Sequence, residues 1–258
     1  MLAVKLPMPI AESLQTRIRS ALAGSEVVNS RSDIAVLVSS CDNYRDVWNA
    51  FFTLFFRYWP DCPLPVYLVS NFESYPDLRV KTILVGKDKS WSSSFASGLR
   101  KMREPLVIFM MEDYLLDRRA NTERILRLAE YMKSKGAACL RLFPVPGPDQ
   151  PCGDNPEVGE ILKGTDYRLS TQAAIWNRKT LLQLLRWGET PWELELLGSR
   201  RTDALEAPFL SIRRDLPAGP PLSYFCTAVV AGRWRADAIR LCERKGIRVD
   251  LNVRPLER

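Results

Sequence analysis

The chain has 258 residues, 46% of them hydrophobic and 26% charged, which excludes wholesale disorder and suits one large or two small domains. It contains no histidine, so Ser-His-Asp triads, Cys-His dyads and HExxH zinc sites are excluded. The net charge of +7 favours an anionic partner, such as a nucleotide or an acidic lipid surface. No run of five basic residues occurs, so we expect no nucleic-acid partner.

The cysteines and the hydropathy pattern favour a cytoplasmic protein. The 6 cysteines are far apart and form no CxxC motif, which argues against a zinc or redox site. The longest uncharged stretch, residues 216–232, contains three prolines and therefore cannot be a continuous membrane-spanning helix. The N-terminus has no apolar core before a cleavage site, so secretion is not indicated.

Residues 1–30 are predicted to form an N-terminal amphipathic extension. Apolar side chains recur there at every fourth position, at Ile10, Leu14, Ile18 and Leu22. Arginines stand beside them, so the helix could pack on the domain or on a dimer partner, or lie on the inner membrane face. The oligomeric state stays open.

From residue 33 onward, short apolar runs alternate with helical patterns. Strands are predicted at 34–38, 65–69, 80–85, 106–111 and 138–143, and helices at 44–59, 92–100 and 121–135. This alternation predicts an α/β fold with a mostly parallel central sheet and helices on both faces.

The pattern changes after a proline-rich loop at 144–156. A strand is predicted within 167–176, and a leucine-rich helix at 179–187. Another helix begins with Thr190 as its N-cap and Pro191 at its first position. One or two strands within 222–231 and a helix at 235–245 complete the prediction.

Common cofactor and hydrolase motifs are absent from the sequence. It contains no GxGxxG, GxxxxGK[ST] or GxSxG, which argues against dinucleotide-binding, P-loop and α/β-hydrolase proteins. Catalysis would therefore depend on carboxylates, a metal ion and donors such as arginine, lysine, asparagine and serine.

Polar residues follow the carboxyl ends of the predicted strands, where ligands bind in open α/β sheets. These residues are Asp42, Asn71, Glu112 and Asp113. Because an unpaired buried charge is costly, the two acids after the strand at 106–111 should face a cleft. They could hold a divalent ion on a diphosphate, or instead form a salt bridge or cap the next segment.

A second acidic group opens the helix after Thr190. Glu193 and Glu195 lie in the first turn of this helix, and Trp192 stands beside them. The helix dipole alone accounts for one of the acids. A carboxylate beside a tryptophan, whose ring stacks on a sugar, also suits a general base facing an acceptor hydroxyl.

Five segments in this order resemble bacterial glycosyltransferases of the GT-A fold that assemble polysaccharide and lipopolysaccharide. They are IAVLVSSCDNY, PVYLVSN, VIFMMEDYLL, YRLSTQAAIWNR and TPWELE, and the resemblance covers roughly residues 33–245. It implies one GT-A-like domain over 31–258, in which 31–143 bind the nucleotide-sugar and 144–258 bind the acceptor.

The resemblance also implies roles for individual residues. Ser40, Asp42 and Tyr44 would contact the nucleoside of a UDP- or GDP-sugar, and Asn71 its base. Trp91 and Ser92 would border donor groups, as would Glu112. Asp113 would hold Mg²⁺ or Mn²⁺ on the diphosphate, and Glu193 or Glu195 would act as base, with Trp192 on the acceptor side.

The motif Glu-Asp-Tyr lacks the second spaced acid of a full DxD, so the metal could be dispensable. Asp117 could substitute, or it could belong to a solvated turn. Without a metal, Arg100, Lys101 or Arg103 would have to stabilise the diphosphate, although the interpretation we favour for all three is a solvated helix end.

We therefore expect an inverting glycosyltransferase of cell-surface polysaccharide synthesis, acting on a saccharide or lipid-linked acceptor. A sugar nucleotidyltransferase is one alternative, but it would need a glycine-rich basic loop that residues 39–43 do not supply. A non-catalytic scaffold of a polysaccharide assembly complex is the other alternative.

Overall fold

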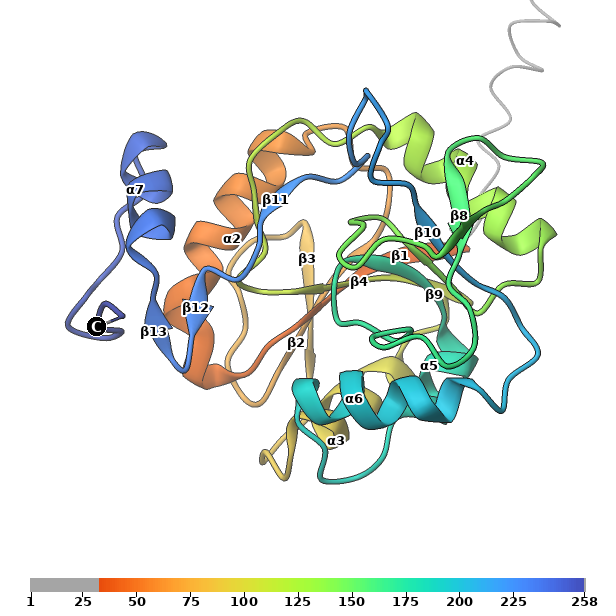
Figure 1. The fold of residues 1–258 in the computed structure, drawn as a ribbon. Coiled ribbons are helices and arrows are strands. Elements are labelled where there is room, and N and C mark those ends of the chain that lie inside the picture. Colours follow the sequence, from red (N-terminus) through yellow and green to blue (C-terminus); the bar gives the residue numbers. More distant parts are fainter. Residues whose placement is uncertain (1–32, 258) are drawn as a thin grey trace, which may run out of the picture. The chain divides into compact units, whose positions relative to one another are not determined.

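A nine-stranded sheet runs through the part of the chain that the computed structural model describes, residues 33–257 (Figure 1). The predicted helix at 1–30, with its membrane or dimer contact, lies outside the described residues. The strand order is β3-β2-β1-β4-β9-β6-β10-β8-β7. The strands are β1 Ile34–Ser39, β2 Val66–Ser70, β3 Val80–Leu84, β4 Leu106–Met111, β6 Cys139–Arg141, β7 Gln150–Pro151, β8 Val158–Glu160, β9 Ala174–Asn177 and β10 Phe209–Ile212.

The first four strands are parallel, as the sequence predicts. Strands β1 and β4 are apolar along nearly their whole length because helices cover both sides of the sheet. Their register pairs Ser39 with Met111, so both strands end at the same edge. The loop after β1 therefore lies beside the acidic pair that follows β4.

Strand β9 is an exception within the mostly parallel sheet that the sequence predicts. It runs antiparallel to both of its neighbours, β4 and β6. An apolar run specifies burial but not direction, so the sequence pattern could not reveal this reversal. Because β9 lies between strands from the first part of the chain, the predicted boundary at residue 143 falls within one continuous sheet.

Helices cover both faces of the sheet, with α2 and α4 on one side and α3, α5 and α6 on the other (Figure 1). They are η1 Asp42–Tyr44, α2 Arg45–Tyr58, α3 Trp91–Lys101, α4 Thr122–Ser134, α5 Arg178–Leu184, α6 Pro191–Thr202 and α7 Ala236–Arg244. Alternate residues of β1 point to opposite faces, so Val36 joins the core cluster that contains Phe51, while Leu37 joins the cluster that contains Phe95. The predicted α/β class, a central sheet flanked by helices, is confirmed.

Short strands bring the C-terminal part of the chain to the edge where β4 ends. Strand β5 (Leu115–Leu116) pairs with β11 (Tyr224–Phe225), and β12 (Val229–Val230) pairs with β13 (Arg233–Trp234). The backbone N–H of Ala228 donates to the carbonyl of Asp113 at 3.1 Å. Within residues 33–257, no helix combines the length and apolar character needed to cross a bilayer.

Candidate active site

A cavity of about 340 Å³ opens where β1 and β4 end, and we call it the sheet-edge cavity. Five parts of the chain contribute to its wall: the loop after β1, the acidic turn after β4, helix α3, the segment before β9 together with the start of α6, and the turn around β12. The side chains used below are Ser40, Tyr44, Trp91, Glu112, Asp113, Thr171, Gln172, Trp192, Glu195, Thr227 and Ala231. Tertiary structure therefore gathers most of the predicted site residues into one place.

Glu112 and Asp113 are both buried and both line the cavity. The Oδ2 atom of Asp113 accepts a hydrogen bond from the backbone N–H of Val229 at 3.3 Å. Burial raises the pKa of Asp113 to about 6. Burial and the adjacent Asp113 charge raise the pKa of Glu112 well above its ordinary value. Both carboxyls therefore hold their protons more strongly than exposed acids do.

The acidic pair fits a divalent ion that is shared with a diphosphate. The Oε2 atom of Glu112 is buried without a hydrogen-bond partner among the described residues, beside the carboxylate of Asp113. Residues 33–257 contain no group of three or more acidic or cysteine side chains arranged to hold a metal by themselves. One or two carboxylates suffice for Mg²⁺ when phosphate oxygens and water complete its coordination.

Glu195, on helix α6, lines the same cavity. Its Oε1 atom accepts hydrogen bonds from the Thr171 backbone N–H at 2.7 Å, the Thr171 hydroxyl at 2.9 Å and the Ser170 hydroxyl at 3.0 Å. All the hydrogen bonds that this carboxylate makes within the described chain go to that oxygen. The Oε2 atom is therefore available to accept a proton.

Glu193, the other candidate base, has a structural role at the start of α6. Its carboxylate accepts from the Thr190 backbone N–H at 2.8 Å, while the Thr190 hydroxyl accepts from the Glu193 N–H at 3.2 Å. This capping box holds the pKa of Glu193 below its ordinary value through the hydrogen bonds from Thr190. Glu193 is exposed and does not line the cavity, so the structure separates the two glutamates.

Ser40 and Tyr44 line the cavity, but Asp42 and Asn71 do not. The Asp42 carboxylate accepts from the Ser70 hydroxyl at 2.6 Å and from three backbone N–H groups at residues 71–73. Burial acts to raise the pKa of Asp42, but these hydrogen bonds outweigh it and lower the pKa. The Asn71 amide donates to the carbonyl of Gly86 at 3.0 Å. Both side chains hold the turn after β2, and their contact with the donor stays a prediction.

Helix α3 contributes Trp91 to the cavity, but not Ser92. The indole N–H of Trp91 donates to the Ser39 hydroxyl at 3.0 Å, and its ring stacks on Phe95 with centroids 5.2 Å apart. Ser92 lies on a different surface of the helix, where it lines a second cleft. Trp192 is 68% exposed at the cavity wall, where a bound saccharide could reach its ring.

The other charged candidates lie away from this cavity. Asp117 accepts from the Ser223 hydroxyl at 2.7 Å and does not line the cavity. The ammonium of Lys101 donates to the carbonyl of Leu84, and Arg103 is absent from the cavity wall. Arg100 lines the second cleft. None of the three basic residues is therefore positioned to stabilise a diphosphate held at Asp113.

Neither a protein-family model nor a curated protein sequence matches the chain. Solved structures do match its fold. S. aureus TarS 1–349 is 14% identical, with a TM-score of 0.44, over 69% of this chain and 57% of that one. The TarS 1–349 complex with UDP-GlcNAc is 15% identical, with a TM-score of 0.39, over 56% of this chain and 45% of that one.

A cytidylyltransferase from Leptospira borgpetersenii is 10% identical, with a TM-score of 0.42, over 83% of this chain and 95% of that one. The chain thus spans a little over half the length of TarS 1–349. These likenesses are distant, and they concern the fold alone.

Several residues that line the cavity have no role predicted from the sequence. The Oε1 atom of Gln172 accepts from the Tyr224 hydroxyl at 2.7 Å, which orients a side-chain amide at the wall. Thr227 and Ala231 adopt left-handed backbone conformations, with φ of 60° and 48°. Such conformations favour glycine, so the sequence gives no sign of them. The only signal for Gln172 was its place in the segment YRLSTQAAIWNR.

Proposed function

We propose that the protein is a nucleotide-sugar-dependent glycosyltransferase. It would transfer a sugar from a nucleoside diphosphate to a saccharide or lipid-linked acceptor, with inversion at the anomeric carbon. The observation that carries this proposal is one cavity lined by both Asp113 and Glu195. One carboxylate suits the leaving diphosphate and the other suits the attacking hydroxyl, which are the two centres that such a reaction needs.

The donor would lie along the carboxyl ends of β1 and β4. Ser40 and Tyr44 would contact the nucleoside, and Trp91 would border the bound donor. Asp113, with Glu112 beside it, would hold Mg²⁺ or Mn²⁺. When bound, such an ion neutralises the negative charge that develops on a departing diphosphate. Both acids are buried, and electrostatic interactions are stronger in such surroundings than in bulk water.

Glu195 would serve as the base. Its Oε2 atom would accept the proton of the acceptor hydroxyl while the hydroxyl oxygen forms a bond to the anomeric carbon. The bond from that carbon to the diphosphate oxygen would break, and its electron pair would leave with the nucleoside diphosphate. Thr171 and Ser170 fix the orientation of the carboxylate through three hydrogen bonds to Oε1. Trp192 would stack on the acceptor sugar.

The acceptor class follows from the sequence resemblance to enzymes of bacterial cell-surface polysaccharide synthesis. A lipid-linked acceptor would bring the protein to the inner face of the membrane from the cytoplasm. The basic net charge of +7 supports contact with an acidic membrane surface.

The full chain should be incubated with a panel of UDP- and GDP-sugars and Mn²⁺, with candidate saccharide acceptors. The expected result is release of a nucleoside diphosphate with at least one donor, and an increase in thermal stability with the matching nucleotide. A nucleotidyltransferase would instead release pyrophosphate from a nucleoside triphosphate and a sugar phosphate. A scaffold would give neither product and no thermal shift, and either of these results would overturn the proposal.

A further inference from the structure

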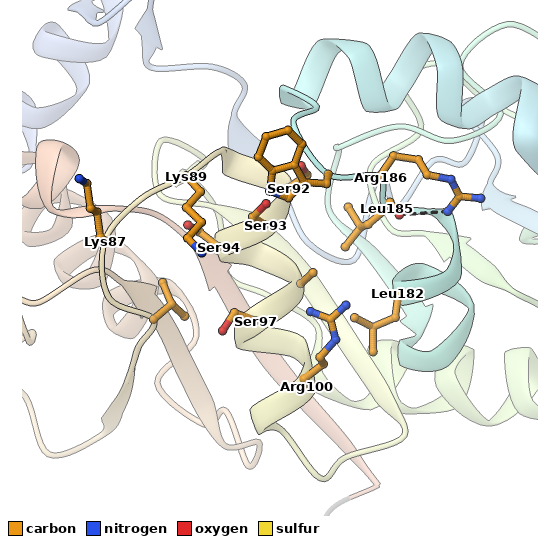
Figure 2. Close-up of a pocket in the computed structure, with 13 residues that line it drawn as sticks. Lys87, Lys89, Ser92, Ser93, Ser94, Ser97, Arg100, Leu182, Leu185 and Arg186 are labelled. Atoms are coloured by element: carbon orange, nitrogen blue, oxygen red, sulfur yellow. Dashed lines mark hydrogen bonds between the residues drawn. The ribbon is translucent and has the colours of Figure 1, made fainter.

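A second cleft, of about 320 Å³, lies between helix α3 and the end of α5 (Figure 2). We call it the basic cleft, defined by Lys87, Lys89, Ser93, Ser97, Arg100 and Arg186. Helix α3 contributes to both concavities, because Trp91 and Phe95 line the sheet-edge cavity while Ser93, Ser97 and Arg100 line the basic cleft. Ser94 lines both of them, so the two concavities adjoin at this residue.

The cations of the basic cleft are not neutralised by nearby acids. Within residues 33–257, Lys87, Lys89 and Arg100 form no ion pair, and no acidic residue lines the cleft. Among the described residues, the guanidinium of Arg186 donates only to carbonyl oxygens, those of Gln183 at 2.7 Å and Leu185 at 3.1 Å. Four positive charges thus surround one concave surface.

Two acids that lie close to these cations in sequence have other partners. Asp88 lies between the two lysines in sequence, but it accepts from the Ser94 hydroxyl at 2.7 Å and lines the sheet-edge cavity. Glu189 forms a two-point ion pair with Arg201, at 2.7 and 2.8 Å. The positive charge of the basic cleft is therefore available to a ligand.

Hydroxyl groups complement these cations. Ser93 and Ser97 are four residues apart on α3, and Arg100 is three further, so all three lie on one helix face. Figure 2 shows the lysines on the loop before α3 and Arg186 on the α5 side, so that basic groups come from both sides of the cleft. Phosphate groups are recognised by guanidinium, ammonium and hydroxyl donors at sites that contain no carboxylate.

We propose that the basic cleft is a second binding site, which takes a phosphate group. This inference is independent of the proposed glycosyltransferase activity. A lipid headgroup and a soluble phosphorylated compound share the required chemistry. Trp187, 78% exposed, also lines the cleft and would meet the bilayer interface if the phosphate belongs to a lipid.

The first test is a titration of the isotope-labelled full chain with inorganic pyrophosphate, followed by NMR. Saturable shifts are expected for the amides of Ser93 and Ser97. The triple variant Lys89→Ala/Arg100→Ala/Arg186→Ala should weaken binding by about tenfold or more, because it removes charge-assisted hydrogen bonds. A thermal melt of the variant verifies that it is folded.

The matched control removes the same amount of charge from other surfaces of the molecule. Its substitutions are Arg118→Ala/Arg240→Ala/Arg244→Ala, before α4 and on α7. None of these residues lines the basic cleft, so pyrophosphate affinity should stay within about twofold of the native value when three remote charges are lost.

The second arm measures co-sedimentation with vesicles of phosphatidylcholine alone, or of equal parts phosphatidylcholine and phosphatidylglycerol. Binding to the anionic vesicles that is lost in the triple variant would identify a lipid headgroup as the source of the phosphate. Binding of pyrophosphate alone, lost in the same variant, would identify a soluble compound. The proposal is overturned if neither probe binds, if only amides around the sheet-edge cavity shift, or if the control variant loses as much affinity as the triple variant.

Discussion

The backbone N–H and the hydroxyl of Thr171 both donate to the same carboxylate oxygen of Glu195, at 2.7 and 2.9 Å. Thr171 lies just before β9, the strand that enters the sheet antiparallel between β4 and β6. The reversed strand thereby brings these donors to the carboxyl ends of β1 and β4. The carboxylate of Glu195 is fixed in orientation by a segment distant from α6 in sequence.

Glu195→Gln should lower kcat by about a hundredfold or more, because an amide cannot accept the acceptor's proton. The KM for the nucleotide-sugar should change little, since Glu195 faces the acceptor in the proposed complex. Glu193→Gln is the matched control, because glutamine preserves the capping box and Glu193 lies outside the cavity. Steady-state kinetics of both variants test the assignment, and near-native rates in Glu195→Gln would contradict it.

Thr171→Val should lower kcat by roughly tenfold, with an unchanged KM for the donor, because the carboxylate loses one of three groups that orient it. Thr171→Ser restores the hydroxyl and should restore most of the rate. Kinetics of the two variants, accompanied by melting curves, separate positioning from folding. Equal loss in both variants would mean that the hydroxyl has no part in positioning Glu195.

Asp113→Asn should abolish the additional thermal stabilisation that Mn²⁺ gives in the presence of UDP or GDP, because an amide is a poor ligand for a hard cation. Turnover should fall by about a hundredfold. The measurement is a melting curve with nucleotide, with and without Mn²⁺, for the native and variant proteins. An undiminished metal effect in the variant would remove Asp113 from the metal site.

The same substitution should change how stability depends on pH. Burial raises the pKa of Asp113 from 3.8 to about 6, so the folded protein binds more protons than the unfolded chain between these values. The contribution of this group to stability is therefore present below about pH 4 and is lost as the pH rises through about 6, at a cost of up to roughly 3 kcal/mol.

Because asparagine does not ionise, Asp113→Asn should be more stable than the native protein at about pH 7.5, and this advantage should vanish near pH 4. Urea unfolding at both pH values measures the difference. An advantage that is the same at both pH values would show that ionisation of Asp113 is not its cause.

Arg254→Met should destabilise the fold by about 3–5 kcal/mol, because it leaves a buried carboxylate unpaired. The guanidinium makes two hydrogen bonds of 2.9 Å to Asp46, and the two side chains are only 8% and 13% exposed. It also donates to the carbonyl of Gly232 at 3.0 Å. The double variant Asp46→Asn/Arg254→Met should lose much less free energy of unfolding than the two single variants, Asp46→Asn and Arg254→Met, lose together. Additive losses in urea unfolding would contradict this coupling.

Element positions could largely be predicted from the sequence. The strand predicted at 34–38 is Ile34–Ser39, and the strand predicted at 106–111 is Leu106–Met111. Both are continuous apolar runs, as expected for strands covered on two faces. Helix starts had local signals as well, since the Asn121 side chain accepts from the Arg124 N–H at 3.0 Å and caps α4 as predicted.

Strand direction and some strands could not be predicted. Strand β10, Phe209–Ile212, was not among the predicted elements, although it is fully buried. Its four residues are too short a run to separate from a loop by pattern. Its partners β6 and β8 lie far away in sequence, and the pairing with these two strands specifies it as a strand.

The sequence by itself determined where chain segments become strands and helices, because burial patterns and capping residues act over a few neighbouring positions. Only the tertiary structure decided which polar side chains face the sheet-edge cavity. Successive helical residues turn by about 100°, so Glu193 and Glu195 leave α6 in nearly opposite directions and have different partners. Asp42 likewise does not line the cavity, because its carboxylate binds the backbone N–H groups of a distant turn. Such choices depend on segments that meet only after folding.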